Sequence, residues 1–341
     1  MNILILSAGT RDKIVQFFRR ELAGRGRVIA TDCSELAPAL YEADKAYIVP
    51  RIDAPDYIDR ILAICKEEQI GGLFSLIDPE LSLIAKNRTR FEAIGTVPVV
   101  SSFELCETSL DKYRMMETFT RFGLKTARCY LTLEDFRAAA AAGEVSLPVF
   151  VKPRLGSASL GINRVDDEEL LAALMHTDPD LMIQELMRGQ EYGADVYIDL
   201  LSGKCTHIFL KKKIKMRAGE TDKSVSVRDP ALFAEIARFA EGAGYRGMID
   251  IDLFHVEEEG APDHGTWYFS EVNPRFGGGY PHAYACGVNF PAAMLKNLAG
   301  REGTPAVGDY ETGVCMMKFN ETMIRSEKEL CPSADSTGEN A

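Results

Sequence analysis

The sequence predicts an α/β domain followed by an α+β region, and two patterns along the chain lead to this prediction. In the first hundred residues, apolar strands alternate with amphipathic helices, which is typical of a parallel sheet covered by helices. Beyond residue 103, most strands follow one another with only short turns between them, which favours antiparallel sheets. With 46% hydrophobic and 26% charged residues, the chain has the composition of a protein that fills a core.

The alternation of strands and helices in the N-terminal region predicts a Rossmann-like parallel sheet. A helix at 57–68 carries Ile58, Ile61 and Cys65 on one stripe. The first strand ends at Gly9, but the other glycines of a dinucleotide fingerprint are absent, so NAD binding is not supported. The loop from Gly9 to Arg11 either contacts a substrate or is a plain turn. Strands are expected at 2–6, 28–31, 73–77 and 97–100, and the helices between them at 12–23 and 57–68.

The rest of the chain reads as one or two α+β lobes. Strands are expected at 148–152, 181–185, 192–200, 206–215, 248–256 and 266–273, and helices at 110–122, 168–175 and 230–243. We divide the chain into an α/β domain at 1–104, a small lobe at 105–183, a C-terminal lobe at 184–325 and a flexible tail at 326–341.

Charge and composition exclude several classes of protein. The 39 Lys and Arg against 51 Asp and Glu give a net charge of −12, which argues against a general nucleic-acid binder. Because no apolar stretch reaches about 18 residues, no membrane span is expected. The eight cysteines form no CxxC motif, and we expect reduced thiols in a cytoplasmic protein.

A glycine-rich loop follows a lysine that ends an apolar strand. The segment from Gly156 to Gly161 matches GxxxxG, but Ile162 and Asn163 stand where a Walker A loop needs Lys and Ser or Thr. Its backbone amides can still wrap phosphate oxygens. Lys152 is costly on an apolar strand unless its ammonium meets an anion or water. It is either a phosphate-binding lysine or a structural lysine that reaches solvent.

The most informative segment is a predicted hairpin that carries carboxylates. Strand alternation and a symmetric turn place Asp252 opposite Glu271 and Asp250 opposite Asn273. Opposed like charges repel unless a cation lies between them or water screens them. Asp252, Glu271 and Asn273 form a set of oxygen ligands suited to Mg²⁺, and an exposed acidic hairpin is the alternative.

Further polar residues flank the hairpin. Arg275 could hold a transferring phosphoryl group or an acyl phosphate. The glycines at 277–279 form either an anion site or a turn, and His282 alone is weak evidence for acid–base chemistry.

Two other groups of charged residues are candidates for substrate contacts. Alternation along the basic segment sends Lys211, Lys213, Lys215 and Arg217 to one side, where they form either a contact for the triphosphate or an anionic substrate, or a solvated face. Asp78 and Glu80 follow an apolar strand of the first domain and could receive a substrate amine.

Taken together, these motifs resemble the ATP-grasp superfamily over residues 105–300, in particular the branch of the carbamoyl-phosphate synthetase large subunit. The first hundred residues look like its pre-ATP-grasp domain. The resemblance implies a two-lobed ATP-grasp fold in which Lys112 and Lys152 bind nucleotide and Arg275 belongs to the NPR motif. It also implies that Glu191 binds the ribose hydroxyls and that Asp252, Glu271 and Asn273 bind Mg²⁺ or Mn²⁺. Further implied nucleotide contacts are Gly156, Ser157, Ala158, Ser159 and Gly161 over the phosphates and Gln184, Glu185, Leu186 and Met187 beside adenine.

The function implied by the resemblance is ATP-dependent activation of a carboxylate as an acyl phosphate, which an amine or another nucleophile then attacks. The partners would be a small carboxylate and an amine, and the protein could form a homo-oligomer. Two alternatives are a catalytically inactive ATP-binding module and carbamoyl-phosphate-type phosphorylation of bicarbonate. The chain shows no internal duplication, which counts against the second alternative.

Overall fold

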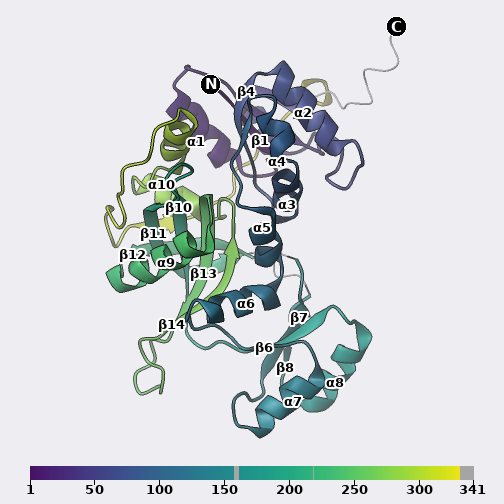
Figure 1. The fold of residues 1–341 in the computed structure, drawn as a ribbon, viewed down its shortest axis with the longest axis vertical. Helices are drawn as coiled ribbons and strands as arrows, with labels where there is room; N and C mark the ends of the chain where they lie inside the picture. The colour runs from purple at the N-terminus through teal and green to yellow at the C-terminus, as the bar shows by residue number, and fades with distance from the viewer. Residues whose placement is uncertain (157–160, 218, 331–341) are drawn as a thin grey trace.

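The computed structural model describes residues 1–156, 161–217 and 219–330, and three sheets organise them (Figure 1). The N-terminal sheet lies at one end of the molecule and the small lobe lies at the other. The large antiparallel sheet lies between them, with helices α5 and α6 along its side.

The N-terminal domain is a parallel sheet, as the sequence predicts, and its five strands have the order β3-β2-β1-β4-β5. Its apolar strands are buried on both faces because helices cover each side. Strand β3 is short and only partly buried, and the sequence pattern did not reveal it. The elements are β1 (Asn2–Leu6), α1 (Asp12–Leu22), β2 (Val28–Asp32), η1 (Pro38–Glu42), β3 (Lys45–Ile48), α2 (Tyr57–Glu67), β4 (Ile70–Ser75), α3 (Asp78–Lys86), α4 (Arg88–Glu92) and β5 (Val97–Pro98).

The large sheet has the order β14-β13-β10-β11-β12-β15, and every pair in it is antiparallel. Helix α9 begins at Pro230, and Asp229 caps it through the backbone N–H groups of Ala231 and Leu232. The elements are β10 (Gln190–Ile198), β11 (Cys205–Arg217), β12 (Glu220–Val227), α9 (Pro230–Ala243), β13 (Gly247–His255), β14 (Trp267–Asn273), α10 (Tyr280–Ala285), α11 (Phe290–Leu298), β15 (Cys315–Met317) and η2 (Glu327–Glu329).

The small lobe is an antiparallel sheet of four strands in the order β6-β9-β7-β8, with helices α7 and α8 packed against it. The helices α5 and α6 precede it and connect it to the N-terminal domain. The elements are α5 (Phe103–Leu110), α6 (Lys112–Arg121), β6 (Cys129–Tyr130), α7 (Leu133–Ala141), β7 (Val149–Pro153), β8 (Asn163–Val165), α8 (Glu168–Thr177) and β9 (Leu181–Glu185).

The clusters of buried side chains do not follow the three sheets one by one. One cluster of buried side chains joins the N-terminal domain, helix α6 and the large sheet, whereas the small lobe has a separate core. The boundary predicted at 183/184 falls inside β9, which runs to Glu185, and the division of the chain into domains stays a prediction. Among the described helices, none has the length and hydropathy that a bilayer span requires.

Helix α6 is held by aromatic packing. The Phe119 side chain is 0% exposed, and its ring centroid lies 5.2 Å from that of Phe239 and 5.4 Å from that of Phe269. Because α6 belongs to the shared core, Phe119 fixes the start of the small lobe against the large sheet.

We predict that Phe119→Ala lowers the free energy of unfolding by about 3–5 kcal/mol, because it empties a buried aromatic site. Urea denaturation of the two proteins measures the difference. Leu170→Ala is the control, since Leu170 is 45% exposed on α8 and its truncation should cost less than about 0.5 kcal/mol. A loss below about 1 kcal/mol for Phe119→Ala would contradict the packing role.

His282 of α10 connects α10 to two other segments. Its Nε2 donates to the Val314 carbonyl oxygen at 3.0 Å, and its Nδ1 accepts from the Ser224 hydroxyl at 2.8 Å. The ring is 1% exposed. Burial, aided by the Lys211 ammonium, lowers the pKa of His282 to about 4. It is therefore a neutral structural residue, and the structure gives no support to an acid–base role.

A neutral buried histidine makes stability depend on pH. Between pH 6.5 and about 4 the unfolded chain binds a proton that the folded His282 does not, so stability should fall as the pH falls. At pH 5 this contribution is about 2 kcal/mol relative to pH 7. We predict that His282→Gln reduces the difference in unfolding free energy between pH 7 and pH 5 by that amount. An unchanged difference would show that another group titrates instead.

Candidate active site

The hairpin β13–β14 brings two carboxylates face to face. Asp252 pairs with Glu271 and Asp250 pairs with Asn273 in the register, which confirms the predicted pairing. The register shifts between Asp252 and Leu253, so a bulge follows the acidic pair directly. Burial raises the pKa of Asp252, and the Glu271 carboxylate raises it further while Lys213 opposes both. Burial and the neighbouring carboxylate therefore both disfavour the ionised form of Asp252.

Lys213 of β11 reaches this pair from two strands away. Its Nζ lies 2.5 Å from Asp252 Oδ1 and 3.9 Å from Glu191 Oε1. Gly193 of β10 makes the reach possible, because a Cβ there would lie 3.1 Å from Lys211 Cε and 3.3 Å from Lys213 Cε. The predicted site residues Glu191, Lys213 and Asp252 thus lie together on one face of the sheet.

A second ionic group lies deeper on the same face. Lys211 Nζ is 2.5 Å from Asp195 Oδ2, and both side chains are 1% exposed. Lys211 Nζ also lies 3.7 Å from Asp250 Oδ1. Asp195 is a site residue outside the set predicted from the sequence, although a charged residue on the apolar strand β10 is the same signal that indicates Lys152. This group fixes the strand that carries Asp250 and Asp252.

The two predicted nucleotide lysines come from different elements of the small-lobe side. Lys112 begins α6, and its Nζ donates to the Gly156 carbonyl oxygen at 2.5 Å. Burial lowers the pKa of Lys152, Lys112 lowers it further, and Glu271 raises it. Burial also lowers the pKa of Lys112, and Glu271 is the first group that opposes this. Both ammonium groups therefore lie within electrostatic reach of the Glu271 carboxylate.

The predicted phosphate loop is described only at its ends. Gly156 has φ 107° and Gly161 has φ 70°, conformations that side chains with a Cβ rarely adopt. Ser157, Ala158 and Ser159 lie outside the described residues.

The predicted hinge lies where the chain passes between the lobes. Gln184 is buried and donates from Nε2 to Cys129 Sγ at 3.3 Å, while Glu185 Oε2 accepts from the Arg128 N–H at 3.1 Å. Leu186 and Met187 follow the end of β9 and are half-buried. In the described part of the chain, neither has a backbone partner in the sheets, so their N–H and C=O groups are available to a base.

Arg275 is held from the N-terminal domain. Its Nη2 and Nε donate to Asp78 Oδ2 at 3.0 and 3.2 Å, and its Nη1 donates to the Phe276 carbonyl oxygen at 3.1 Å. Asp78 therefore lies at the site, but its carboxylate binds the Arg275 guanidinium and not a substrate amine. Glu80 does not, because it turns into the core and accepts from the Tyr57 and Ser75 hydroxyls. The expectation that Glu80 receives a substrate amine is wrong, since residues 78 and 80 lie on different sides of α3.

A second contact between the domains lies beside the first. Arg11 Nη2 lies 2.9 Å from Glu220 Oε1, and Lys318 Nζ lies 2.8 Å from Glu220 Oε2. The glycines at 277–279 pack against this charged layer, since a Cβ at Gly277 would lie 2.5 Å from Asp250 Cγ and one at Gly278 would lie 2.8 Å from Glu220 Cδ. Because these carboxylates would repel an anion, the loop at 277–279 is better explained as a turn that allows close packing than as an anion site.

The alternation predicted for the basic segment ends at Lys213. Lys211 and Lys213 are buried on the site face, but the register of β11 shifts after Lys213. Lys215 and Arg217 are consequently exposed, and Arg217 pairs with Asp222 at 3.3 Å. Their exposure favours the solvated face over a contact with a triphosphate, and that contact stays a prediction.

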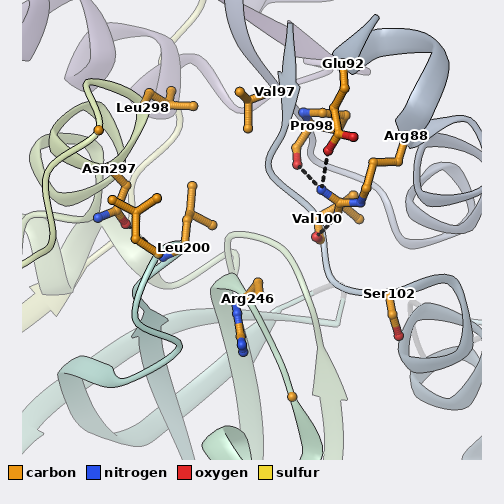
Figure 2. Close-up of a pocket in the computed structure, with 13 residues that line it drawn as sticks. Arg88, Glu92, Val97, Pro98, Val100, Ser102, Leu200, Arg246, Asn297 and Leu298 are labelled. Carbon is orange, nitrogen blue, oxygen red and sulfur yellow. Dashed lines mark hydrogen bonds and ion pairs between the residues drawn. The ribbon is translucent and has the colours of Figure 1, made fainter.

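A cavity of about 520 Å³ lies at the other end of β13 (Figure 2). Arg246 precedes the strand there, and Val97 and Leu298 line the opposite wall. Arg88 is satisfied by the Pro98 and Val100 carbonyl oxygens and by Glu92. Six residues at about 3.3 Å each separate Arg246 from Asp252, so this cavity is distinct from the acidic pair.

The donor set at the acidic pair fits Mg²⁺ and a nucleotide. The Asp252 and Glu271 carboxylates and the Asn273 amide supply hard oxygen ligands, and Asn273 Nδ2 lies 3.3 Å from Glu271 Oε1. Among the described residues, no group of three His, Cys, Asp or Glu side chains is arranged to hold a metal ion. An ion bound to Asp252 and Glu271 therefore needs Asn273, water or phosphate oxygens to complete its shell.

Comparisons with known proteins agree with this geometry. A family model described as "PylC-like, N-terminal domain" matches residues 3–100, and the model "ATP-grasp in the biosynthetic pathway with Ter operon" matches residues 177–322. The chain is 24% identical to a D-alanine–D-alanine ligase of Pseudomonas entomophila over 270 residues, which cover 74% of this chain and 83% of the ligase.

Two further similarities concern carboxylases and synthases. The arginine-specific carbamoyl phosphate synthase large chain of Bacillus subtilis is 23% identical over 314 residues, 87% of this chain but 29% of the synthase. The biotin carboxylase domain of Hydrogenobacter thermophilus 2-oxoglutarate carboxylase, solved with MgADP and bicarbonate, has a TM-score of 0.72 at 18% identity. That match covers 92% of this chain and 73% of the carboxylase chain. The chain therefore carries a PylC-like N-terminal domain at residues 3–100 and an ATP-grasp domain at residues 177–322, the region that contains the acidic hairpin.

Proposed function

We propose that this protein is an ATP- and Mg²⁺-dependent ligase that activates a carboxylate as an acyl phosphate for attack by an amine. The observation that carries the proposal is the register that opposes Asp252 and Glu271, with Lys112 and Lys152 within electrostatic reach of Glu271. This arrangement neutralises and positions a triphosphate, which is what phosphoryl transfer requires from a protein. The similarity to a ligase that joins two amino acids supports the class of reaction.

In the proposed reaction, each group of residues would bind a different part of the nucleotide, the metal ion or the transferring phosphoryl group. Lys112 and Lys152 would bind phosphate oxygens from the small-lobe side, and Glu191 with the 184–187 segment would bind the nucleoside. Asp252, Glu271 and Asn273 would hold Mg²⁺, which supplies charge neutralisation at the phosphates. Arg275 would stabilise the negative charge of the transferring group, with its guanidinium fixed by Asp78. A protein nucleophile is not needed, because the substrate carboxylate attacks the phosphoryl group.

An ADP-release assay tests the proposed function. The purified protein is incubated with ATP and Mg²⁺ and a panel of amino acids and small carboxylates, each with and without an amine. ADP that depends on one acid, and an amide product by mass spectrometry, would support the ligase. ADP with bicarbonate alone would favour carbamoyl-phosphate-type chemistry, and ATP binding without ADP from any acid would favour an inactive ATP-binding module.

The cellular location and assembly are part of the proposal. We place the protein in the cytoplasm, since the cysteines of the described residues form no disulfide. A homo-oligomer is supported by the similar carboxylase domain, whose structure is described as a dimer.

We predict that Glu271→Gln lowers kcat by about 100-fold or more, because one charged ligand of the metal is lost. The fold should persist, since Glu271 is not part of the buried apolar core. Glu258→Gln in the exposed turn of the same hairpin is the matched control and should keep full activity. Circular dichroism checks the fold of both variants, and full activity of Glu271→Gln would contradict the metal role.

A further inference from the structure

The ion pair between Asp78 and Arg275 connects residues 197 positions apart in the chain. The two side chains are 7% and 12% exposed, so the contact is nearly closed to water. Asp78 comes from the first turn of α3 in the N-terminal domain, and Arg275 follows β14 of the large sheet. One contact therefore links two parts of the molecule at the site itself.

Only one of the two carboxylate oxygens of Asp78 accepts hydrogen bonds from the described residues. Arg275 Nη2 and Nε both donate to Oδ2, at 3.0 and 3.2 Å. Oδ1 is buried and, in the part of the chain that the structure describes, has no hydrogen-bond partner. Asp78 does not cap its own helix, because the residue at the N-cap position is Ile77 and makes no side-chain cap. Within α3 the carboxylate therefore makes no capping hydrogen bond, and the hydrogen bonds that it accepts from the described residues all come from Arg275.

The arginine depends on this carboxylate for its orientation. Its remaining contacts are the Phe276 carbonyl oxygen at 3.1 Å and Asp250 Oδ2 at 4.0 Å from Nη1. Both come from the same part of the chain as Arg275 or from the neighbouring strand. Only Asp78 approaches Nε and Nη2 among the described residues, so removing it would free two of the three nitrogens.

We propose that Asp78 is the positioning residue of Arg275, so that the N-terminal domain completes the phosphoryl-transfer site through this ion pair. The proposal rests on the ligase function proposed above. Asp78 does not touch the reacting atoms. Its carboxylate holds the guanidinium beside Asp250 and close to Glu271, where the transferring group would develop its charge.

Binding of Mg-ADP with and without aluminium fluoride tests this role without turnover. Aluminium fluoride mimics a phosphoryl group in transfer, so wild-type protein should bind the combination more tightly than Mg-ADP in titration calorimetry. Asp78→Asn keeps the shape but loses the charge. We expect it to reduce this gain by between about 10- and 100-fold while the affinity for Mg-ADP itself stays within about twofold.

The double variant separates positioning from an independent effect. Arg275→Gln should lose the same gain, and Asp78→Asn combined with Arg275→Gln should lose no more than Arg275→Gln alone. Tyr284→Phe is the matched control, because it removes a different hydrogen bond between the domains, from the Tyr284 hydroxyl to Glu21 at 2.7 Å. Thermal melts verify that all variants are folded, and Asp78→Glu provides a second carboxylate if Asp78→Asn is unfolded.

Each outcome has a definite meaning. A full gain in Asp78→Asn, losses that add in the double variant, or an equal loss in Tyr284→Phe would overturn the positioning role. If wild-type protein gains nothing from aluminium fluoride, the proposed phosphoryl transfer itself fails, whatever Asp78 does.

Discussion

The opposition of Asp252 and Glu271 across one hairpin is the constraint on which the rest of the site depends. The register of β13 and β14 forces two carboxylates together, and burial makes their charge costly. Positively charged side chains nearby compensate part of that charge. Lys213 contacts Asp252 directly, while Lys112 at the start of α6 and Lys152 of the small lobe lie within electrostatic reach of Glu271. In the proposed ligase the same negative charge attracts the metal, and the lysines meet the phosphates.

A glycine on the intervening strand leaves room for Lys211 and Lys213 to cross it toward the carboxylates of β10 and β13. Gly193 stands between β11 and β13, and a side chain there would meet both Lys211 and Lys213. The buried Lys211–Asp195 pair then fixes the strand spacing beneath the site. Buried ion pairs of this kind contribute little net stability, but removing one partner leaves an uncompensated charge. Their value here is to hold the carboxylates of β13 in one position.

The two sides of the site belong to different clusters of buried side chains. The N-terminal domain and the large sheet share one core, and the Asp78–Arg275 and Arg11–Glu220 pairs lie at their contact. The small lobe packs on itself and connects through α6 and the 186–188 segment. The acidic pair and Arg275 are therefore built on the shared core, while the two predicted nucleotide lysines lie where α6 and the small lobe meet it.

The sequence alone determined those features that depend on local patterns. Period-two alternation and a symmetric turn were sufficient to pair Asp252 with Glu271 and Asp250 with Asn273, and the alternation of strands and helices predicted the parallel sheet. It did not reveal β3 or the break in alternation after Lys213, because a short strand and a register shift leave no periodic signal. The partners of Arg275 and Lys211 were decided only by tertiary structure. Asp78 and Arg275 meet because two domains pack together, and one of two nearby carboxylates, Asp78 and Glu80, is directed at the site by the turn of a helix.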